Sequence, residues 1–135
     1  MKTKLKQSPY IRHSIISDPL DFLQHVEMHH AKKDFMHMNG VSIKLGSDRY
    51  KVFKFKGLTC SHCQKVASFM AIETFKIKSE TLSYHINLYG YDEQGEEILF
   101  TKDHIVPKSK GGADLFDNYQ TMCTVCNAKK GSKIS

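Results

Sequence analysis

The sequence Cys-Thr-Val-Cys at positions 123–126 repeats the spacing of Cys-Ser-His-Cys at positions 60–63, and the two pairs contain all four cysteines of the 135-residue chain. Disulfides are rare in reducing compartments, whereas four thiolates satisfy the tetrahedral coordination of Zn²⁺. One such pair alone could be a redox motif. Two pairs that use every cysteine predict a structural zinc ion, bound by Cys60, Cys63, Cys123 and Cys126. Because the pairs lie far apart in the sequence, this ion would close a large loop.

Alternating apolar residues before and after the first cysteine pair predict short strands. Loop residues and a helix C-cap signal follow them. The expected elements are, in order, a strand at 49–56, a strand at 66–77, a hairpin at 81–101 that turns at 92–95, a loop at 107–117 and a short helix at 123–131. This order predicts an α+β fold.

A helix near 18–38 is predicted ahead of these strands. Asp18 can cap a helix and Pro19 fits its first position, and apolar residues then recur at helical spacing. The pair Asn39-Gly40 is typical of a helix C-terminus.

Several histidines fall within this expected helix, and His25 and His29 would lie one turn apart. The two rings could share a metal ion. We favour the interpretation that they are solvated or face a phosphate, since the surrounding residues match no metal-binding motif.

The net charge of +6 is unevenly distributed. Residues 1–56 contain eleven Lys and Arg against five Asp and Glu, and residues 57–135 contain nine of each. A basic extension beside a neutral module suits the binding of nucleic acid, although solubility explains a charge of this size nearly as well. No apolar run approaches the roughly 20 residues that cross a bilayer, and the N-terminus lacks the apolar segment of a secretory signal. A cytoplasmic protein without membrane partners is therefore expected.

Polar residues follow the predicted hairpin in a recognisable order. They are Asp103-His104, then Pro107 and Gly111-Gly112, then Asp117-Asn118 ahead of Cys123, then Asn127 after Cys126, and finally Lys130-Gly131. This arrangement resembles the signature of HNH endonucleases in their zinc-containing, four-cysteine variety. The resemblance extends from about Lys56 to Gly131 and is close over the last third of the chain.

The resemblance implies a ββα-metal (His-Me) finger with a zinc-bound four-cysteine site, preceded by antiparallel strands and the N-terminal helix. It divides the chain into a basic N-terminal extension at 1–49, with its helix near 18–38, and a zinc-stabilised nuclease domain at 50–135. In such a finger two strands and a helix together hold one divalent cation.

The resemblance also implies the roles of individual residues. Asp103 and Asn127 would bind Mg²⁺ or Mn²⁺, since two oxygen donors suit a hard cation, and Asn127 stands where other members carry histidine. His104 would act as the general base that activates water. Asn118 would orient His104 by hydrogen bonding. Candidates for contacts to DNA phosphates are Lys108, Lys110, Lys129 and Lys130.

Simpler interpretations of several of these residues stay open. Asn118 could serve only in a turn, and His104 could be an ordinary strand histidine. His62 could replace a cysteine as a zinc ligand, although with four cysteines present we expect it to be exposed. His85 could approach substrate from the polar face of its strand. The lysines near the C-terminus could simply complement a helix dipole.

The function expected from these features is metal-dependent hydrolysis of phosphodiester bonds in double-stranded DNA. One catalytic finger would nick a single strand, and a homodimer would be one way to cut both. The alternatives are a catalytically inactive, zinc-stabilised DNA-binding module and an accessory nuclease of a phage or mobile-element assembly.

Overall fold

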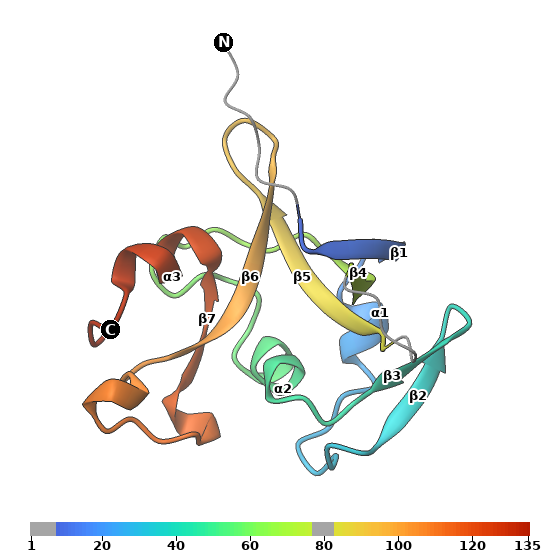
Figure 1. Ribbon diagram of the computed structural model, residues 1–135, viewed down its shortest axis with the longest axis horizontal. Helices are drawn as coiled ribbons and strands as arrows, with labels where there is room; N and C mark the ends of the chain where they lie inside the picture. Colours follow the sequence, from blue (N-terminus) through green and yellow to red (C-terminus); the bar gives the residue numbers. More distant parts are fainter. Residues whose placement is uncertain (1–7, 77–82) are drawn as a thin grey trace.

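The computed structural model describes residues 8–76 and 83–135 (Figure 1). The start of the predicted hairpin at 81–82 and the first seven residues of the basic extension lie outside these ranges. A five-stranded antiparallel sheet runs in the order β1-β4-β5-β6-β7. Its strands are β1 (Tyr10–Ile16), β4 (Phe69–Phe75), β5 (His85–Tyr91), β6 (Glu97–His104) and β7 (Tyr119–Cys123).

The remaining elements are short. A separate two-stranded sheet joins β2 (Phe35–Met38) to β3 (Val41–Lys44). The helices are α1 (Leu20–Leu23), α2 (Asp48–Phe55) and α3 (Thr124–Lys130), and two single 3₁₀ turns, η1 (Lys108–Lys110) and η2 (Phe116–Asn118), lie in the loop between β6 and β7. None of these helices, within the ranges just given, is long and apolar enough to cross a membrane.

The main hydrophobic core lies between one face of the sheet and helices α1 and α2. Ile72, Ile86 and Phe100 point into it from the strands, and Phe22 and Phe53 meet them from the helices. Each of these side chains is almost fully buried, so each contributes on the order of 1.5–3 kcal/mol of apolar transfer free energy. The described residues before position 50 therefore share one core with those that follow.

Strand β6 leaves β5 halfway along its length and continues beside β7 (Figure 1). Helix α2 lies where the two strands separate, and it supplies the hydrogen bonds that β6 no longer makes. The Ile86 N–H donates to the Tyr50 hydroxyl at 2.8 Å, and Arg49 Nη2 donates to the Ile86 carbonyl at 2.6 Å. The backbone N–H and carbonyl of Ile86 in β5 thus keep hydrogen-bond partners although β6 has diverged.

A polar network fills the opposite face of the sheet. Glu73 is 2% exposed and accepts hydrogen bonds from Arg12, Asn87 and Tyr89. Asn87 and Tyr89 are polar residues that alternate with apolar ones along β5, and both are buried where they donate to this carboxylate. Arg12 thus balances the charge of the buried Glu73, and it also pairs with the more exposed Glu97.

The predicted helix at 18–38 was wrong in extent, because α1 ends at Leu23. Asn39 and Gly40 both have positive φ, at 52° and 83°, and form the turn of the β2–β3 hairpin. An Asn-Gly pair is a strong hairpin signal as well as a helix-end signal, and here pairing of β2 with β3 decided between them.

The predicted strand at 49–56 was also wrong, since these residues belong to α2. Tyr50 and Phe53 lie three residues apart and both enter the core, which requires a helical period. The predicted strand at 66–77 is confirmed as β4, and the hairpin that turns at 92–95 is confirmed for its described part as β5 and β6. The helix at the second cysteine pair is confirmed as α3.

Replacing Tyr50 by Phe tests the support that α2 gives to β5. The change removes one oxygen and leaves the fully buried Ile86 N–H without its acceptor, so the free energy of unfolding should fall by about 1–3 kcal/mol. Urea denaturation of the full chain measures this change. The matched control is Tyr91→Phe, which removes an exposed hydroxyl and should alter stability by less than about 0.5 kcal/mol. Equal stability of the two variants would contradict the assignment.

Candidate functional site

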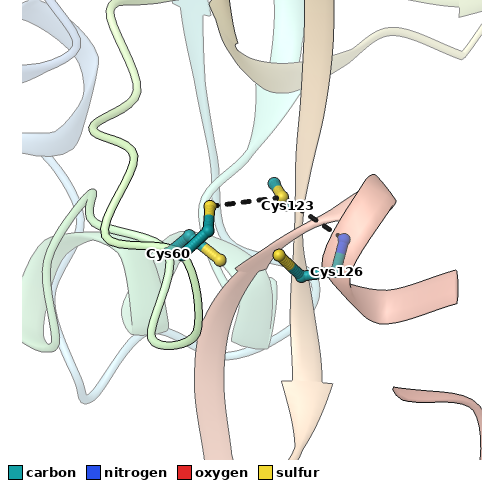
Figure 2. A group of neighbouring side chains, drawn as sticks. Cys60, Cys123 and Cys126 are labelled. Carbon is teal, nitrogen blue, oxygen red and sulfur yellow. Dashed lines mark hydrogen bonds between the residues drawn. The ribbon is translucent and has the colours of Figure 1, made fainter. Parts of the chain in front are cut away.

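The four cysteines converge at the junction of the 60–63 turn with the start of α3. Their sulfur atoms all lie within 4.8 Å of one another, and Cys63 Sγ lies 4.0 Å from Cys123 Sγ. Figure 2 shows the sulfurs of Cys60, Cys123 and Cys126 turned toward a common point. Bonds of about 2.3 Å to one zinc ion would place the sulfurs about 3.8 Å apart, which is close to this spacing. The cluster could therefore hold a zinc ion.

Backbone N–H groups favour ionisation of one cysteine in this cluster. Burial opposes ionisation of Cys60, but donors that include the N–H groups of Cys123 and Cys63 outweigh it and lower the pKa of Cys60 to about 6. Burial raises the pKa of Cys126 to about 12. The Cys126 N–H also points to Cys123 Sγ at 3.5 Å. One thiolate is thus favoured before metal arrives, and a metal ion would have to displace the remaining protons.

The 60–63 turn is fastened to the free edge of β7. The Ser61 N–H donates to the Thr121 carbonyl at 2.9 Å, and the Cys60 N–H donates to the Lys65 carbonyl at 2.8 Å. Gln64 closes the turn with a φ of 66°. These bonds hold the first cysteine pair beside the strand that ends in the second pair.

Asp103 lies on β6 and faces α3, and it is 8% exposed. Its Oδ2 atom accepts a hydrogen bond from Gln120 Nε2 at 3.0 Å and one from Lys130 Nζ at 2.7 Å. Lys130 is itself only 9% exposed in its side chain and also donates to the His104 carbonyl. The carboxylate is therefore neutralised by a buried ammonium group.

Asn127 lies one turn before Lys130 on α3 and meets the neighbouring position on β6. Its Nδ2 atom donates to Thr101 Oγ1 at 3.3 Å. Thr101 and Asp103 share one face of the strand, and Asn127 and Lys130 share one face of the helix. On this helix face, the Lys130 ammonium is the group that contacts the Asp103 carboxylate. Asn127 bonds to Thr101 through its amide nitrogen, so its amide oxygen is not used in that bond.

His104 has partners of its own on the side away from α3. Its Nε2 atom lies 2.7 Å from Asp114 Oδ1, and its ring packs edge-on against Tyr119 at 5.1 Å between centroids. The pairing of β6 with β7 is regular here, so Asp103 and His104 point to opposite faces, as alternation along a strand requires.

Asp114 is a site residue that the sequence reasoning missed. Lys108 Nζ lies 2.9 Å from its second oxygen, and Lys108 and then His104 lower the pKa of Asp114 to about 2. The only signal in the sequence was a carboxylate two positions after Gly112, which by itself is ordinary loop composition. Its relation to His104 depends on how the loop folds back.

Asn118 fixes that loop. Its Oδ1 atom accepts from the Val106 N–H at 3.0 Å, and its Nδ2 atom donates to the carbonyls of Val106 and Ala113 at 3.0 and 2.9 Å. Gly112 packs so closely that an added Cβ would lie 1.8 Å from the Val106 oxygen. Asn118 contacts the backbone that follows His104, and it does not contact the imidazole directly through any bond found in the described residues.

The candidate phosphate-binding lysines fall into two groups. Lys108 and Lys130 form ion pairs, with Asp114 and Asp103 respectively. Lys110 and Lys129 are exposed, and no ion pair of theirs is found within 8–76 and 83–135.

The histidines that the sequence left open are also placed. His62 is exposed, as expected. His85 is half-buried, and burial followed by the nearby Arg49 lowers its pKa. His25 and His29 belong to no converging group of three or more metal-ligand side chains, since the cysteine cluster is the one such group among the described residues.

Replacing Asn118 by Ala tests its role in the loop. The change removes three hydrogen bonds to Val106 and Ala113, so the amide of Val106 should exchange with solvent at least about tenfold faster. Hydrogen-exchange NMR measures this rate. Asp117→Ala, at the exposed neighbouring position, is the control and should leave the rate unchanged. Unaltered protection of Val106 in the Asn118 variant would show that the loop is held by other contacts.

Comparison with known proteins adds one finding to this geometry. Residues 92–135, which include β6, the loop, β7 and α3, match the family model described as HNH endonuclease. No curated protein and no solved structure matches the chain.

Proposed function

We propose, from the match of residues 92–135 to the HNH endonuclease family model, that this chain is a metal-dependent endonuclease that hydrolyses phosphodiester bonds in DNA. The family implies a nucleic acid as substrate. The observation that carries the proposal is that two adjacent residues of β6 point to opposite sides of the strand. Asp103 faces α3, and His104 contacts Asp114 on the other side. We propose that these elements together serve as the ββα-metal finger that the family implies.

The residues present fit a hard cation such as Mg²⁺ or Mn²⁺. The Asp103 carboxylate and the amide oxygen of Asn127 supply oxygen donors from facing elements, and such donors with retained water suit these ions. When bound, the cation would stabilise the negative charge that develops on the phosphate. Lys130 now neutralises Asp103, so binding of a cation requires this ammonium to move away from the carboxylate or share it.

His104 is the proposed general base. Its Nε2 atom is occupied by Asp114, so its Nδ1 atom is the nitrogen left to accept a proton from water. The Asp114 carboxylate would favour the tautomer with hydrogen on Nε2 and would stabilise the imidazolium after proton transfer. Asp114 is thus a positioning residue, and Lys108 in turn holds Asp114.

Asn118 is proposed to act indirectly. It fixes the backbone of Val106, two residues after His104, and so limits movement of the strand end that carries the base. Lys110 and Lys129 remain the candidates for phosphate contacts because their charges are exposed. Lys108 and Lys130 would serve in phosphate binding only after leaving their present partners.

The cysteine cluster is proposed to bind a structural zinc ion. Zinc at this point would fix the start of α3 against the 60–63 turn and so set the position of Asn127 and Lys130 against β6. Structural zinc contributes on the order of 10 kcal/mol to small domains, which is comparable to the whole stability of a chain of this length.

One observation favours a second candidate, a zinc-stabilised DNA-binding module without catalysis. The ion pair between Lys130 and Asp103 is buried on both sides, and a module that never binds a catalytic cation would retain it. The first proposal has two further forms. The chain could be an accessory nuclease within a phage or mobile-element assembly, or a homodimer that cuts both strands.

Incubation of the zinc-loaded chain with supercoiled plasmid and Mg²⁺ or Mn²⁺ tests the proposal. Nicked circles should accumulate, and His104→Ala should reduce the rate by about 10²- to 10⁴-fold because the base is lost. Asp114→Asn should reduce it less, since the imidazole remains but loses its charged partner.

His37→Ala is the matched control, because His37 is an exposed histidine on β2 in the separate sheet. The nicking activity of this variant should equal that of the unchanged protein. DNA binding without cleavage under both metals would support the binding module. Cleavage that persists in the His104 variant would show that another group activates water.

Metal analysis tests the zinc site separately. Native mass spectrometry should find one zinc ion per chain, and Cys126→Ser or a strong chelator should remove it and lower the melting temperature sharply. His62→Ala, within the same turn, should retain the ion because four sulfurs already converge. If the His62 variant loses zinc and the Cys126 variant retains it, His62 rather than Cys126 would be the fourth zinc ligand.

A further inference from the structure

A cavity of about 500 Å³ lies between α3, β7 and the 60–63 turn, on the side of the molecule where α3 and the C-terminus lie in Figure 1. Gln120 and Lys130 line it, and both also contact the Asp103 carboxylate, at 3.0 and 2.7 Å. Asp103 itself, His104 and Asn127 do not line it. The cavity is therefore next to the proposed catalytic residues but separate from them.

One part of the cavity wall is apolar. Ile105 and Met122 contribute from the sheet side, and Ile134 contributes from the segment after α3. That segment is fastened in place, because the Ser135 N–H donates to the Ile105 carbonyl at 3.0 Å and Gln120 Nε2 donates to Ser135 Oγ at 2.7 Å. The apolar wall is thus built from residues distant in sequence.

The other part of the wall is cationic. Lys129 and Lys133 line the cavity, and no Asp or Glu side chain does. Within 8–76 and 83–135 neither Lys129 nor Lys133 has an ion-pair partner, unlike Lys130 beside them. A ligand that satisfies both parts must combine an anionic group with an apolar body.

We propose that this cavity binds one unpaired nucleotide of the nucleic-acid substrate. Its phosphate would lie against Lys129 and Lys133, and its base would lie against Ile105, Met122 and Ile134. The volume lies within the roughly 300–1,000 Å³ range of small-molecule sites. A base within a duplex is covered by its neighbours on both faces, so only a base that has left the stack can contact such a wall.

This inference rests on the proposed function and specifies its substrate. A nuclease with this cavity beside its catalytic residues cleaves DNA faster near a gap, loop or branch than within a continuous duplex. The preference comes from the contacts to the unpaired nucleotide, and so depends on Lys133, which has no place in the proposed hydrolysis itself.

Methyl NMR of the zinc-loaded full chain tests the binding step with thymidine 5′-monophosphate as the probe. The methyl signals of Ile105, Met122 and Ile134 should shift on titration, and Lys133→Ala should weaken binding by about tenfold, as expected for the loss of one charged contact. Lys44→Ala, an exposed lysine on β3, is the control and should leave the affinity unchanged. Equal shifts with inorganic phosphate alone would overturn the proposal, since they would indicate an anion site without a base subsite. Absence of shifts would overturn it as well.

A cleavage experiment separates this inference from the proposed function. The ratio of kcat/KM for a duplex with a single-nucleotide gap to kcat/KM for the continuous duplex should exceed one and should fall about tenfold in Lys133→Ala. Cleavage with a ratio of one would overturn the cavity proposal and leave the nuclease proposal standing. Methyl shifts without cleavage of either DNA would overturn the nuclease proposal and leave the nucleotide site standing.

Discussion

Four sulfur atoms converge where α3 begins, and the proposed chemistry depends on the position of that helix. Cys123 ends β7 and Cys126 lies in the first turn of α3. A cation bound by these cysteines and by the 60–63 turn would therefore fix the end of β7 and the start of α3. The helix is only seven residues long, which is too short to be stable by its own hydrogen bonds. Its face toward β6 carries the side chains that reach Thr101 and Asp103. Zinc bound by the cluster would therefore hold each of these contacts in place.

The buried carboxylate of Asp103 imposes a second constraint, because a charge at this depth must be balanced. Lys130 balances it in the structure, and a divalent cation would balance it during hydrolysis. Exchange of one for the other keeps the carboxylate paired throughout, although displacement of the ammonium group adds to the cost of binding the metal. Lys130 lies between Asp103 and the cavity beside α3, and its displaced ammonium would add positive charge to the cavity wall.

The sequence predicted the cysteine cluster and the C-terminal elements better than the N-terminal half of the fold. The cysteine pairs, the β5–β6 hairpin and α3 follow from short-range patterns that tertiary contacts did not override. Asn39-Gly40 satisfied two local rules, and only the partner strand β3 decides between them. The 48–55 helix alternates like a strand in sequence, and only its packing, with Tyr50 and Phe53 both in the core, requires a helical period. Asp114 could not be predicted, since its contact with His104 depends on the folded loop.

Charge counted along the sequence also differs from charge available to a ligand. Among the basic residues of the N-terminal part, Arg12 pairs with two carboxylates, and Lys54 and Lys56 donate to backbone carbonyls. Their charges stabilise the fold, so the excess of positive charge before position 57 overstates the attraction for a phosphate backbone. Lys129 and Lys133 belong to the part of the chain with no net charge, yet their ammonium groups line a cavity without acidic residues. Local placement, rather than regional charge, therefore decides where this protein can bind a nucleotide.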